Sequence, residues 1–162
     1  MPIEAVRSYF ETLGIAGRIL EFEESSATVE LAAHAVGCEP ARIAKTLSFC
    51  VGENAVLIVA AGDAKVDNTR FKAQFHTKAK MLTPDEAVSR IGHAVGGVCP
   101  FAVKEGVQVY LDRSLQRFET VYPACGSANS AIELTLQELE RFSRFTAWVD
   151  VCKAWRPEEQ AR

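Results

Sequence analysis

The sequence has no apolar run near the ~20 residues that a membrane-spanning helix needs. Its first residues include Glu4 and Glu11, whereas a signal peptide would be basic and then apolar. We therefore expect a cytoplasmic protein without a membrane partner. Neither charge dominates, because 18 Lys and Arg residues face 21 Asp and Glu residues, which gives a net charge of −3. This balance disfavours the wide basic surface of a duplex-binding protein, so DNA is not an expected partner.

Common metal-binding and nucleotide-binding motifs are also missing. The five cysteines form no C-x-x-C pair, and their odd number disfavours a disulfide framework. The three histidines lie far apart, at positions 34, 76 and 93, so no metal site is indicated. The chain contains no G-x-G-x-x-G, Walker, H-E-x-x-H or G-x-S-x-G motif. These absences disfavour dinucleotide, triphosphate, zinc-protease and serine-hydrolase chemistry.

The remaining pattern is that of an ordinary globular protein. Apolar residues make up 48% of the 162 residues, and a chain of this size buries roughly 70% of its unfolded surface. We predict one domain over residues 1–162. Periodicity and turn residues predict helices over 3–13, 28–37, 68–75, 83–91 and from 135 onwards, and strands over 18–23, 45–51, 55–61, 78–82, 107–111, 120–122 and 131–134.

Local signals make several of these elements specific. Residues 52–54 have the length and composition of a hairpin loop, which predicts an antiparallel pair over 45–61. Thr83 and Thr135 each precede a glutamate by three residues, the pattern of a capping box. We predict an α+β fold, with a mixed sheet surrounded by helices and an aromatic helical tail over residues 141–162.

The most unusual segment is residues 92–101, where three glycines and a proline interrupt the regular pattern. Adjacent glycines let a backbone approach a ligand closely and present N–H groups that polarise a carbonyl. The alternative is a connecting loop without a functional role, which could have the same spacing of glycines. Lys45 is a lone cation near the start of an apolar strand. It either faces solvent or meets a phosphate or a developing negative charge in a cleft.

Two further groups suggest other chemistry. Cys99 and His93 lie six residues apart and could form a thiol nucleophile and its base, although simple packing of Cys99 is the alternative. Residues 64–80 hold five basic residues and one acidic residue, in a chain that is otherwise acidic. This segment is either a solvated face or a seat for a few RNA phosphates.

Three short motifs are found at residues 42–47 (RIAKTL), 59–63 (VAAGD) and 96–100 (GGVCP), and further pieces lie at 67–68, 79–81, 110–112 and 131–134. With these motifs in this order, the chain resembles the YbaK and prolyl-tRNA synthetase-associated editing domain family. The likeness covers roughly residues 20–140. Members of this family hydrolyse the ester of a mischarged tRNA, mostly proline tRNA that carries alanine, cysteine or a similar small residue.

The resemblance implies a mixed, partly barrel-like sheet surrounded by helices, and trans-editing without a metal or cofactor. The resemblance implies that Lys45 contacts the 3′ terminal adenosine of the tRNA. It also implies that the loop beginning at Gly96 holds the aminoacyl carbonyl through backbone N–H groups. The attacking group is a water or a group of the substrate itself. The residues expected to bind substrate are Phe22, Thr46, Asp63, Gly97, Val98, Cys99 and Pro100.

Three departures from the family pattern bear on specificity. Phe22 stands where cysteine-specific members have tyrosine, and Ala124 and Ala131 stand where they have serine and aspartate. Loss of these polar groups disfavours cysteine editing and leaves alanine, serine, threonine or a non-protein amino acid open. A pocket lined by Phe22 and Val98 would favour small apolar side chains.

The expected partners are the 3′ acceptor end of a tRNA, with proline tRNA favoured, and prolyl-tRNA synthetase. An alternative of a different class is a catalytically silent module that binds tRNA or a synthetase through residues 64–80.

Overall fold

The hairpin predicted at residues 45–61 organises the structure. In the computed structural model, which describes residues 2–160, β2 (Ile43–Val51) pairs antiparallel with β3 (Asn54–Ala61) along its whole length. Parallel pairing places β5 (Gln108–Asp112) beside β3 and β6 (Thr120–Pro123) beside β2. Residues 56–61 of β3 have no exposed surface, as expected for a central strand that is covered on both faces.

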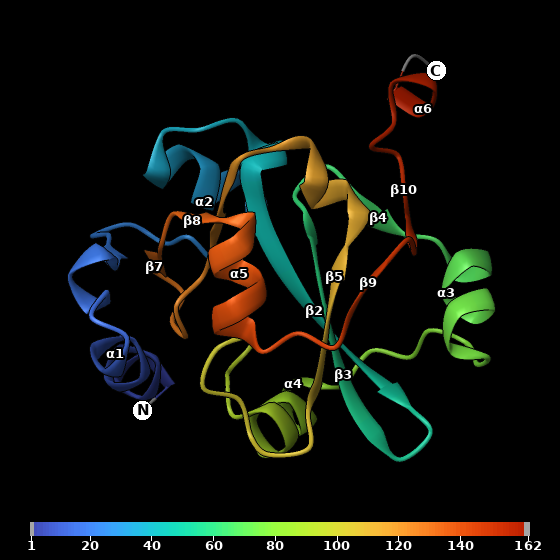
Figure 1. The fold of residues 1–162 in the computed structure, drawn as a ribbon, viewed down its shortest axis with the longest axis horizontal. Coiled ribbons are helices and arrows are strands. Elements are labelled where there is room, and N and C mark those ends of the chain that lie inside the picture. Colours follow the sequence, from blue (N-terminus) through green and yellow to red (C-terminus); the bar gives the residue numbers. More distant parts are fainter. Residues whose placement is uncertain (1, 161–162) are drawn as a thin grey trace.

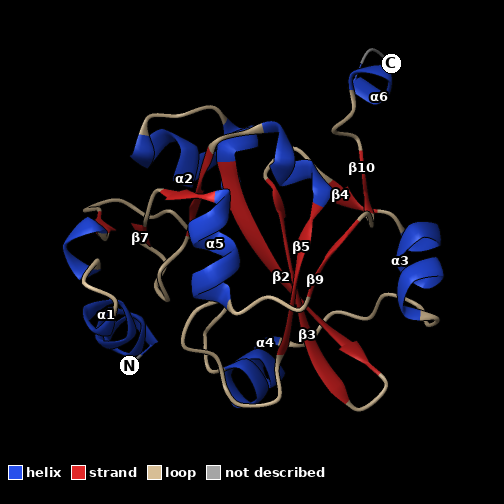
Figure 2. Ribbon diagram, in the orientation of Figure 1, coloured by secondary structure: helices blue, strands red, loops and turns tan. Residues whose placement is uncertain are grey.

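Six strands form the main sheet in the order β8-β6-β2-β3-β5-β9, with β8 (Leu134–Thr135) and β9 (Ala147–Val149) at its edges. Two short antiparallel pairs lie outside it: β1 (Leu20–Glu21) with β7 (Ser130–Ala131), and β4 (Lys65–Val66) with β10 (Cys152–Lys153). The sheet curls into a half barrel that helices flank (Figures 1 and 2). The predicted α+β class with a partly barrel-like sheet is confirmed.

The helices begin and end largely where the sequence signals placed them. Thr28 and Asp67 cap α2 and α3, and capping boxes at Thr83 and Thr135 start α4 and α5. None of the helices within residues 2–160 has the length and apolar character needed to cross a membrane. The helical elements are α1 (Pro2–Thr12), η1 (Ala16–Arg18), α2 (Val29–Val36), η2 (Pro40–Arg42), α3 (Asn68–Phe75), α4 (Pro84–Glu86), η3 (Ala87–Ile91), η4 (Arg113–Arg117), α5 (Leu136–Ser143) and α6 (Pro157–Gln160).

The predicted helical tail over residues 141–162 is wrong in its central part. Helix α5 ends at Ser143, and Arg144 adopts a left-handed conformation with φ 51°. The chain then forms β9, which pairs parallel with β5, and β10, which pairs with β4. Only residues 157–160 are helical again, and residues 161–162 of the predicted tail lie outside the described part of the chain. Sheet pairing therefore overrides the helical pattern there.

Two predicted strands also differ from the structure. Residues 78–82 make only an isolated bridge, between Met81 and Phe49, because the segment touches β2 briefly and then enters α4. The predicted strand at 131–134 is divided into β7 and β8, which pair with different partners. Side-chain pattern could not reveal this change of partner.

A salt bridge at the start of α5 gives a pH-dependent prediction. Arg18 lies 2.7 Å from Glu138 and holds the pKa of that carboxyl at about 2, below its ordinary 4.5. The stabilisation is therefore complete above about pH 4.5 and is lost as the pH falls towards 2. We expect Glu138→Gln to lower the free energy of unfolding by about 1 kcal/mol at pH 7, because the pair is partly exposed and screened. Urea unfolding at several pH values should show this difference shrinking towards pH 2; a constant difference would contradict it.

Candidate active site

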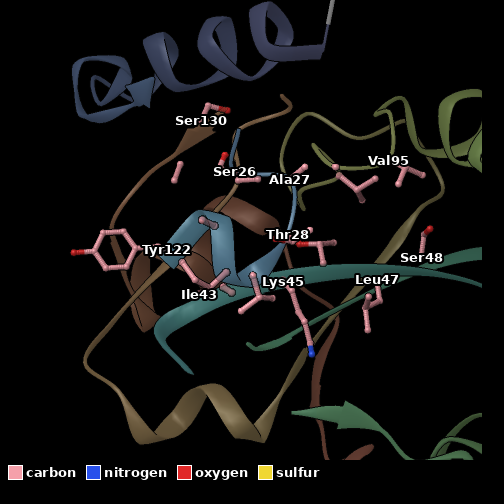
Figure 3. Close-up of a pocket in the computed structure, with 18 of the residues that line it drawn as sticks. Ser26, Ala27, Thr28, Ile43, Lys45, Leu47, Ser48, Val95, Tyr122 and Ser130 are labelled. Carbon is pink, nitrogen blue, oxygen red and sulfur yellow. The ribbon is translucent and has the colours of Figure 1, made fainter. Parts of the chain in front are cut away.

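A cavity of about 330 Å³ lies between α2, the first half of β2 and the loop that follows η3 (Figure 3). Strand β6 and the segment around β7 close another side. Most of the lining is apolar, with a few hydroxyls and one amine. The residues that line it are Ser26, Ala27, Thr28, Val29, Ala32, Ile43, Ala44, Lys45, Thr46, Leu47, Ser48, Met81, Leu82, Val95, Gly96, Val98, Tyr122, Ala124, Ser130 and Ala131.

Lys45 supplies the amine, at one edge of this cavity. Its Nζ donates hydrogen bonds to the backbone oxygens of Gly62 (3.3 Å) and Ala64. In Figure 3 the side chain points away from Ser26 and Val95, towards the edge of the lining. Burial lowers the pKa of Lys45 from the ordinary lysine value, although nearby negative charges such as Asp63 oppose this. A cation held by carbonyls is placed to meet an anionic ligand at the rim.

The turn after β3 provides these carbonyls because of a close backbone approach. A Cβ on Gly62 would lie 2.0 Å from the backbone oxygen of Pro40 and 2.7 Å from a methyl carbon of Val29. Only glycine lets this turn pack against η2 and α2. The sequence motif at residues 59–63 thus has a local physical reason: its glycine sets the position of the acceptor for Lys45.

The glycine-rich loop lines the cavity and contains backbone donors without a partner among the described residues. Gly96 has φ 94°, a conformation that favours glycine, and Gly97 packs so tightly that a Cβ would lie 2.7 Å from the backbone N of Ser127. The Gly97 N–H already donates to the oxygen of Ala94 at 3.0 Å. Within residues 2–160, the N–H groups of Gly96 and Val98 make no hydrogen bond. Both residues line the cavity, so these two donors have no competing partner in the described chain.

Two hydroxyls in the lining are also without partners. Ser26 Oγ and Thr46 Oγ1 are buried, and neither makes a hydrogen bond in the described part of the chain. A buried hydroxyl without a partner costs free energy, so a ligand or water that fills the cavity would gain by pairing with them. Thr28 and Ser130 differ, because Thr28 Oγ1 caps Leu31 and Ser130 Oγ accepts a bond from Ser127.

The structure brings four of the predicted site residues together: Lys45, Thr46, Gly96 and Val98 all line the cavity. Five others lie outside the lining as far as residues 2–160 show, namely Phe22, Asp63, Gly97, Cys99 and Pro100. Among these, Gly97 packs against the backbone of Ser127, and Pro100 borders a second cavity of about 280 Å³.

The expectation that Phe22 lines the pocket differs from the structure for a clear reason. Its backbone N–H donates to the oxygen of Asn129 at 2.8 Å, and the Asn129 side chain donates back to the oxygen of Phe22. This exchange extends the β1–β7 pair and leaves Phe22 outside the lining. Asp63 forms an ion pair with Arg117 at 2.5 Å, so its carboxylate is engaged beside the Lys45 turn and lies outside the cavity.

Cys99 and His93 do come together, but in the core. The Sγ atom lies 3.6 Å from Nε2 of His93, and that nitrogen is 2.8 Å from the backbone oxygen of Phe101. Cys99 has no exposed surface and His93 has 1%. Burial raises the pKa of the Cys99 thiol to about 12 and lowers the pKa of His93. A buried, neutral thiol is a poor nucleophile, so the structure disfavours the cysteine-hydrolase hypothesis.

This arrangement predicts that Cys99 is dispensable for chemistry. We expect Cys99→Ala to keep ester hydrolysis within about twofold of the unmodified protein, with only a modest loss of stability from the small cavity it creates. The measurement is the initial rate of amino acid release together with the unfolding midpoint. A loss of 100-fold or more in a folded variant would restore a role for the thiol.

The sequence did not single out five lining residues with polar groups: Ser26, Thr28, Ser48, Tyr122 and Ser130. Thr28 is also the N-cap of α2. Tyr122 and Ser130 reach the cavity because β6 pairs with the start of β2, and β7 with β1, pairings that no local pattern announces. Ala124 and Ala131, noted in the sequence as departures, do line the cavity. No group of three or more potential metal-ligand side chains occurs within residues 2–160.

Known proteins resemble this chain in sequence and in fold. The model of the aminoacyl-tRNA editing domain matches residues 23–142. The chain belongs to this family. The recognition made from the motifs around Lys45 and Gly96 is therefore confirmed.

Two kinds of relatives extend the comparison. The chain is 53% identical over 156 residues to the uncharacterized protein YwhH of Bacillus subtilis (strain 168), covering 96% of this chain and 99% of that protein. A crystal structure of a protein proposed to be a trans-editing enzyme for prolyl tRNA synthetase matches with a TM-score of 0.84 and 27% identity, covering 94% of this chain and 97% of the other. The crystal structure of hypothetical protein APE2540 matches with a TM-score of 0.77 and 25% identity, over 90% of this chain and 99% of the other.

Proposed function

We propose that this editing-domain protein is an aminoacyl-tRNA deacylase that acts in trans, and that its substrate is proline tRNA charged with a small wrong amino acid, alanine foremost. The observation that carries the proposal is one cavity that holds Lys45 and the unpaired N–H groups of Gly96 and Val98. Family membership and the similar structure that is linked to prolyl tRNA synthetase support it. The reaction needs charged tRNA, which places the activity in the cytoplasm.

The chemistry requires little from side chains. An aminoacyl ester is already activated, so hydrolysis depends mainly on positioning and on stabilising the oxyanion. In our proposal the N–H groups of Gly96 and Val98 donate to the carbonyl oxygen, and their hydrogen bonds strengthen as negative charge develops there. Lys45 holds the terminal adenosine of the tRNA at the rim. Water attacks the carbonyl carbon, and the ester bond to the ribose oxygen breaks to release the amino acid and the free tRNA end.

The lining supports a small apolar side chain as the residue removed. Ala124, Ala131 and Val98 leave no charged group beside the space for that side chain. The hydroxyls of Ser26 and Thr46 are available for the substrate's amino group or for the attacking water. A pocket of this kind separates side chains that differ by one methylene by only about 1–3 kcal/mol, so graded rates are expected.

The test is the release of amino acid from proline tRNA charged in turn with alanine, serine, cysteine and proline. We expect the alanine ester to be hydrolysed at least about tenfold faster than the cysteine and proline esters. Equal rates on all four esters would contradict the proposed selectivity. Salt-sensitive binding of tRNA without turnover of any ester would instead support a silent binding module.

A further inference from the structure

Two lysines face each other in the short ribbon formed by β4 and β10. The antiparallel register pairs Lys65 directly with Lys153. Directly paired residues project from the same face of a ribbon with Cβ atoms about 5 Å apart, and both lysines are exposed. Like charges at such positions destabilise the pairing. The ribbon thus carries a charge pair that is unfavourable in the absence of an anion.

The ribbon is continuous with the Lys45 edge of the cavity. Lys45 Nζ donates to the backbone oxygen of Ala64, the residue that directly precedes Lys65. After burial, the positive charge of Lys65 adds to the lowering of the Lys45 pKa, which places the two charges within electrostatic range. Three lysines therefore follow one another from the rim of the cavity onto β4 and β10.

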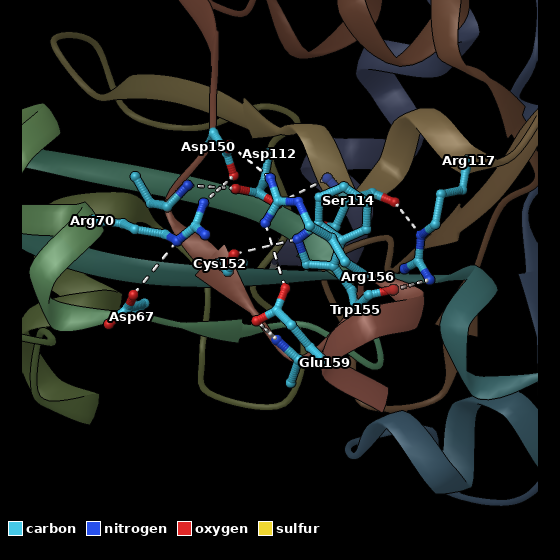
Figure 4. Close-up of polar contacts among 12 residues, drawn as sticks. Asp67, Arg70, Asp112, Ser114, Arg117, Asp150, Cys152, Trp155, Arg156 and Glu159 are labelled. Atoms are coloured by element: carbon cyan, nitrogen blue, oxygen red, sulfur yellow. Dashed lines mark hydrogen bonds and ion pairs between the residues drawn. The ribbon is translucent and has the colours of Figure 1, made fainter. Parts of the chain in front are cut away.

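The lysines of the ribbon differ from the neighbouring arginines in whether they form ion pairs. Three nearby arginines are neutralised by carboxylates: Arg70 by Asp67 and Asp150, and Arg156 by Asp150 and Glu159 (Figure 4). Arg117 pairs with Asp63 in the same way. Within residues 2–160, the side chain of neither Lys65 nor Lys153 forms an ion pair or a hydrogen bond. The two ammonium groups thus carry positive charge that no carboxylate of the described chain neutralises, on one face of the ribbon.

We infer that Lys65 and Lys153 together bind phosphates of the tRNA strand that leads to the aminoacylated adenosine. The inference rests on the proposed function and adds a contact surface outside the cavity. Bound phosphates would remove the repulsion between the two ammonium groups, in a protein whose net charge is −3. Strand β10 lies beyond residue 142, where the family match ends, so the C-terminal segment supplies one half of this surface.

The main test compares a double variant with a matched control. We expect Lys65→Ala with Lys153→Ala to raise the KM for alanyl proline tRNA roughly tenfold without changing kcat, because each lysine acts on binding alone. The slope of log affinity against log salt should fall by about 1.4, the value for two contacts to single-stranded phosphates. Hydrolysis of the alanyl ester of adenosine, which lacks those phosphates, should not change.

Lys104→Ala is the control, because Lys104 is an exposed lysine that lies before β5, at the opposite end of β3 from Lys65. It should leave both substrates unaffected. If the double variant behaves like Lys104→Ala on the full tRNA, the inference is wrong. An equal loss on the adenosine ester would also overturn it, since the lysines would then act on the cavity.

A second variant separates binding from a structural role. Lys65→Glu places opposite charges across the ribbon, so we expect Tm to rise by about 1–3 °C while tRNA affinity falls. A fall in both quantities would show that Lys65 serves the fold.

Binding of uncharged proline tRNA, followed by fluorescence anisotropy, makes this test independent of turnover. If the protein hydrolyses no ester but the double variant still loses tRNA affinity, the proposed function fails and the phosphate surface stands. If affinity for tRNA is unchanged while affinity for prolyl-tRNA synthetase is lost, the ribbon binds protein and the inference is overturned.

Discussion

Lys45→Ala is expected to reduce kcat/KM for hydrolysis of alanyl proline tRNA by about 100-fold, the size of effect that a small misplacement of a bound substrate can cause, because Lys45 positions the terminal adenosine. The Lys45 ammonium is the one charged group that lines the cavity in the described chain, and two backbone carbonyls hold it at the rim. The fold should be retained, because the side chain is only half-buried and lines the cavity. Single-turnover release of labelled alanine gives the rate, and thermal unfolding gives the stability.

The charge of Lys45 adds a pH signature to this prediction. Burial lowers the pKa of Lys45, so the ammonium loses its proton at a lower pH than an ordinary lysine as the pH rises. Activity above the uncatalysed rate should therefore decline on the alkaline side, and Lys45→Arg, if active, should decline later because arginine stays charged. Unchanged activity in Lys45→Ala would remove this residue from the mechanism.

Gly62→Ala is expected to cause the largest loss of stability, about 3 kcal/mol in the free energy of unfolding. The new Cβ would lie 2.0 Å from the backbone oxygen of Pro40, and backbone cannot move aside as a flexible side chain can. The clash forces apart η2 and the turn that holds Lys45, so activity should fall as well. Chemical unfolding measures the first effect and ester hydrolysis the second.

Gly17→Ala is the matched control for this change. A Cβ at Gly17 meets nothing within 4 Å, and neither glycine has a left-handed φ, so the two variants differ only in the available space. We expect Gly17→Ala to change stability by no more than about 0.5 kcal/mol. Equal effects of the two substitutions would show that the tight packing at Pro40 does not constrain the turn.

The elements that the sequence predicted well are those with local causes. The loop at residues 52–54 sets the β2–β3 hairpin, and hydroxyl caps at Thr83 and Thr135 start two helices, because the interacting groups lie within a few residues of each other. The prediction of a helical tail over residues 141–162 was wrong in its central part for the opposite reason. Trp148 lies in β9 because residues 147–149 pair with residues 110–112, far back in the chain, and such pairing leaves no local pattern.

The residues of the candidate site also fall into those with a local sequence signal and those without one. Lys45 and Gly96 could be found because each sits in a motif that local geometry requires: a carbonyl turn for one and a left-handed turn for the other. Cys99 belongs to the same motif as Gly96, and Phe22 lies in the region of the family resemblance, but neither residue lines the cavity. Ser26 and Tyr122 were missed because only the assembled sheet brings them to it. Motifs thus locate a site, and packing decides which side chains in them reach it.

The central claim is that the cavity beside Lys45 holds the aminoacyl end of a tRNA. Its most direct test is a crystal structure with a non-hydrolysable alanyl-adenosine in which an amide replaces the ester. We predict that the alanyl carbonyl oxygen lies within about 3 Å of the N–H groups of Gly96 and Val98, with the adenosine at Lys45. Binding in the second cavity beside Pro100, or with the carbonyl turned away from the loop, would contradict this account.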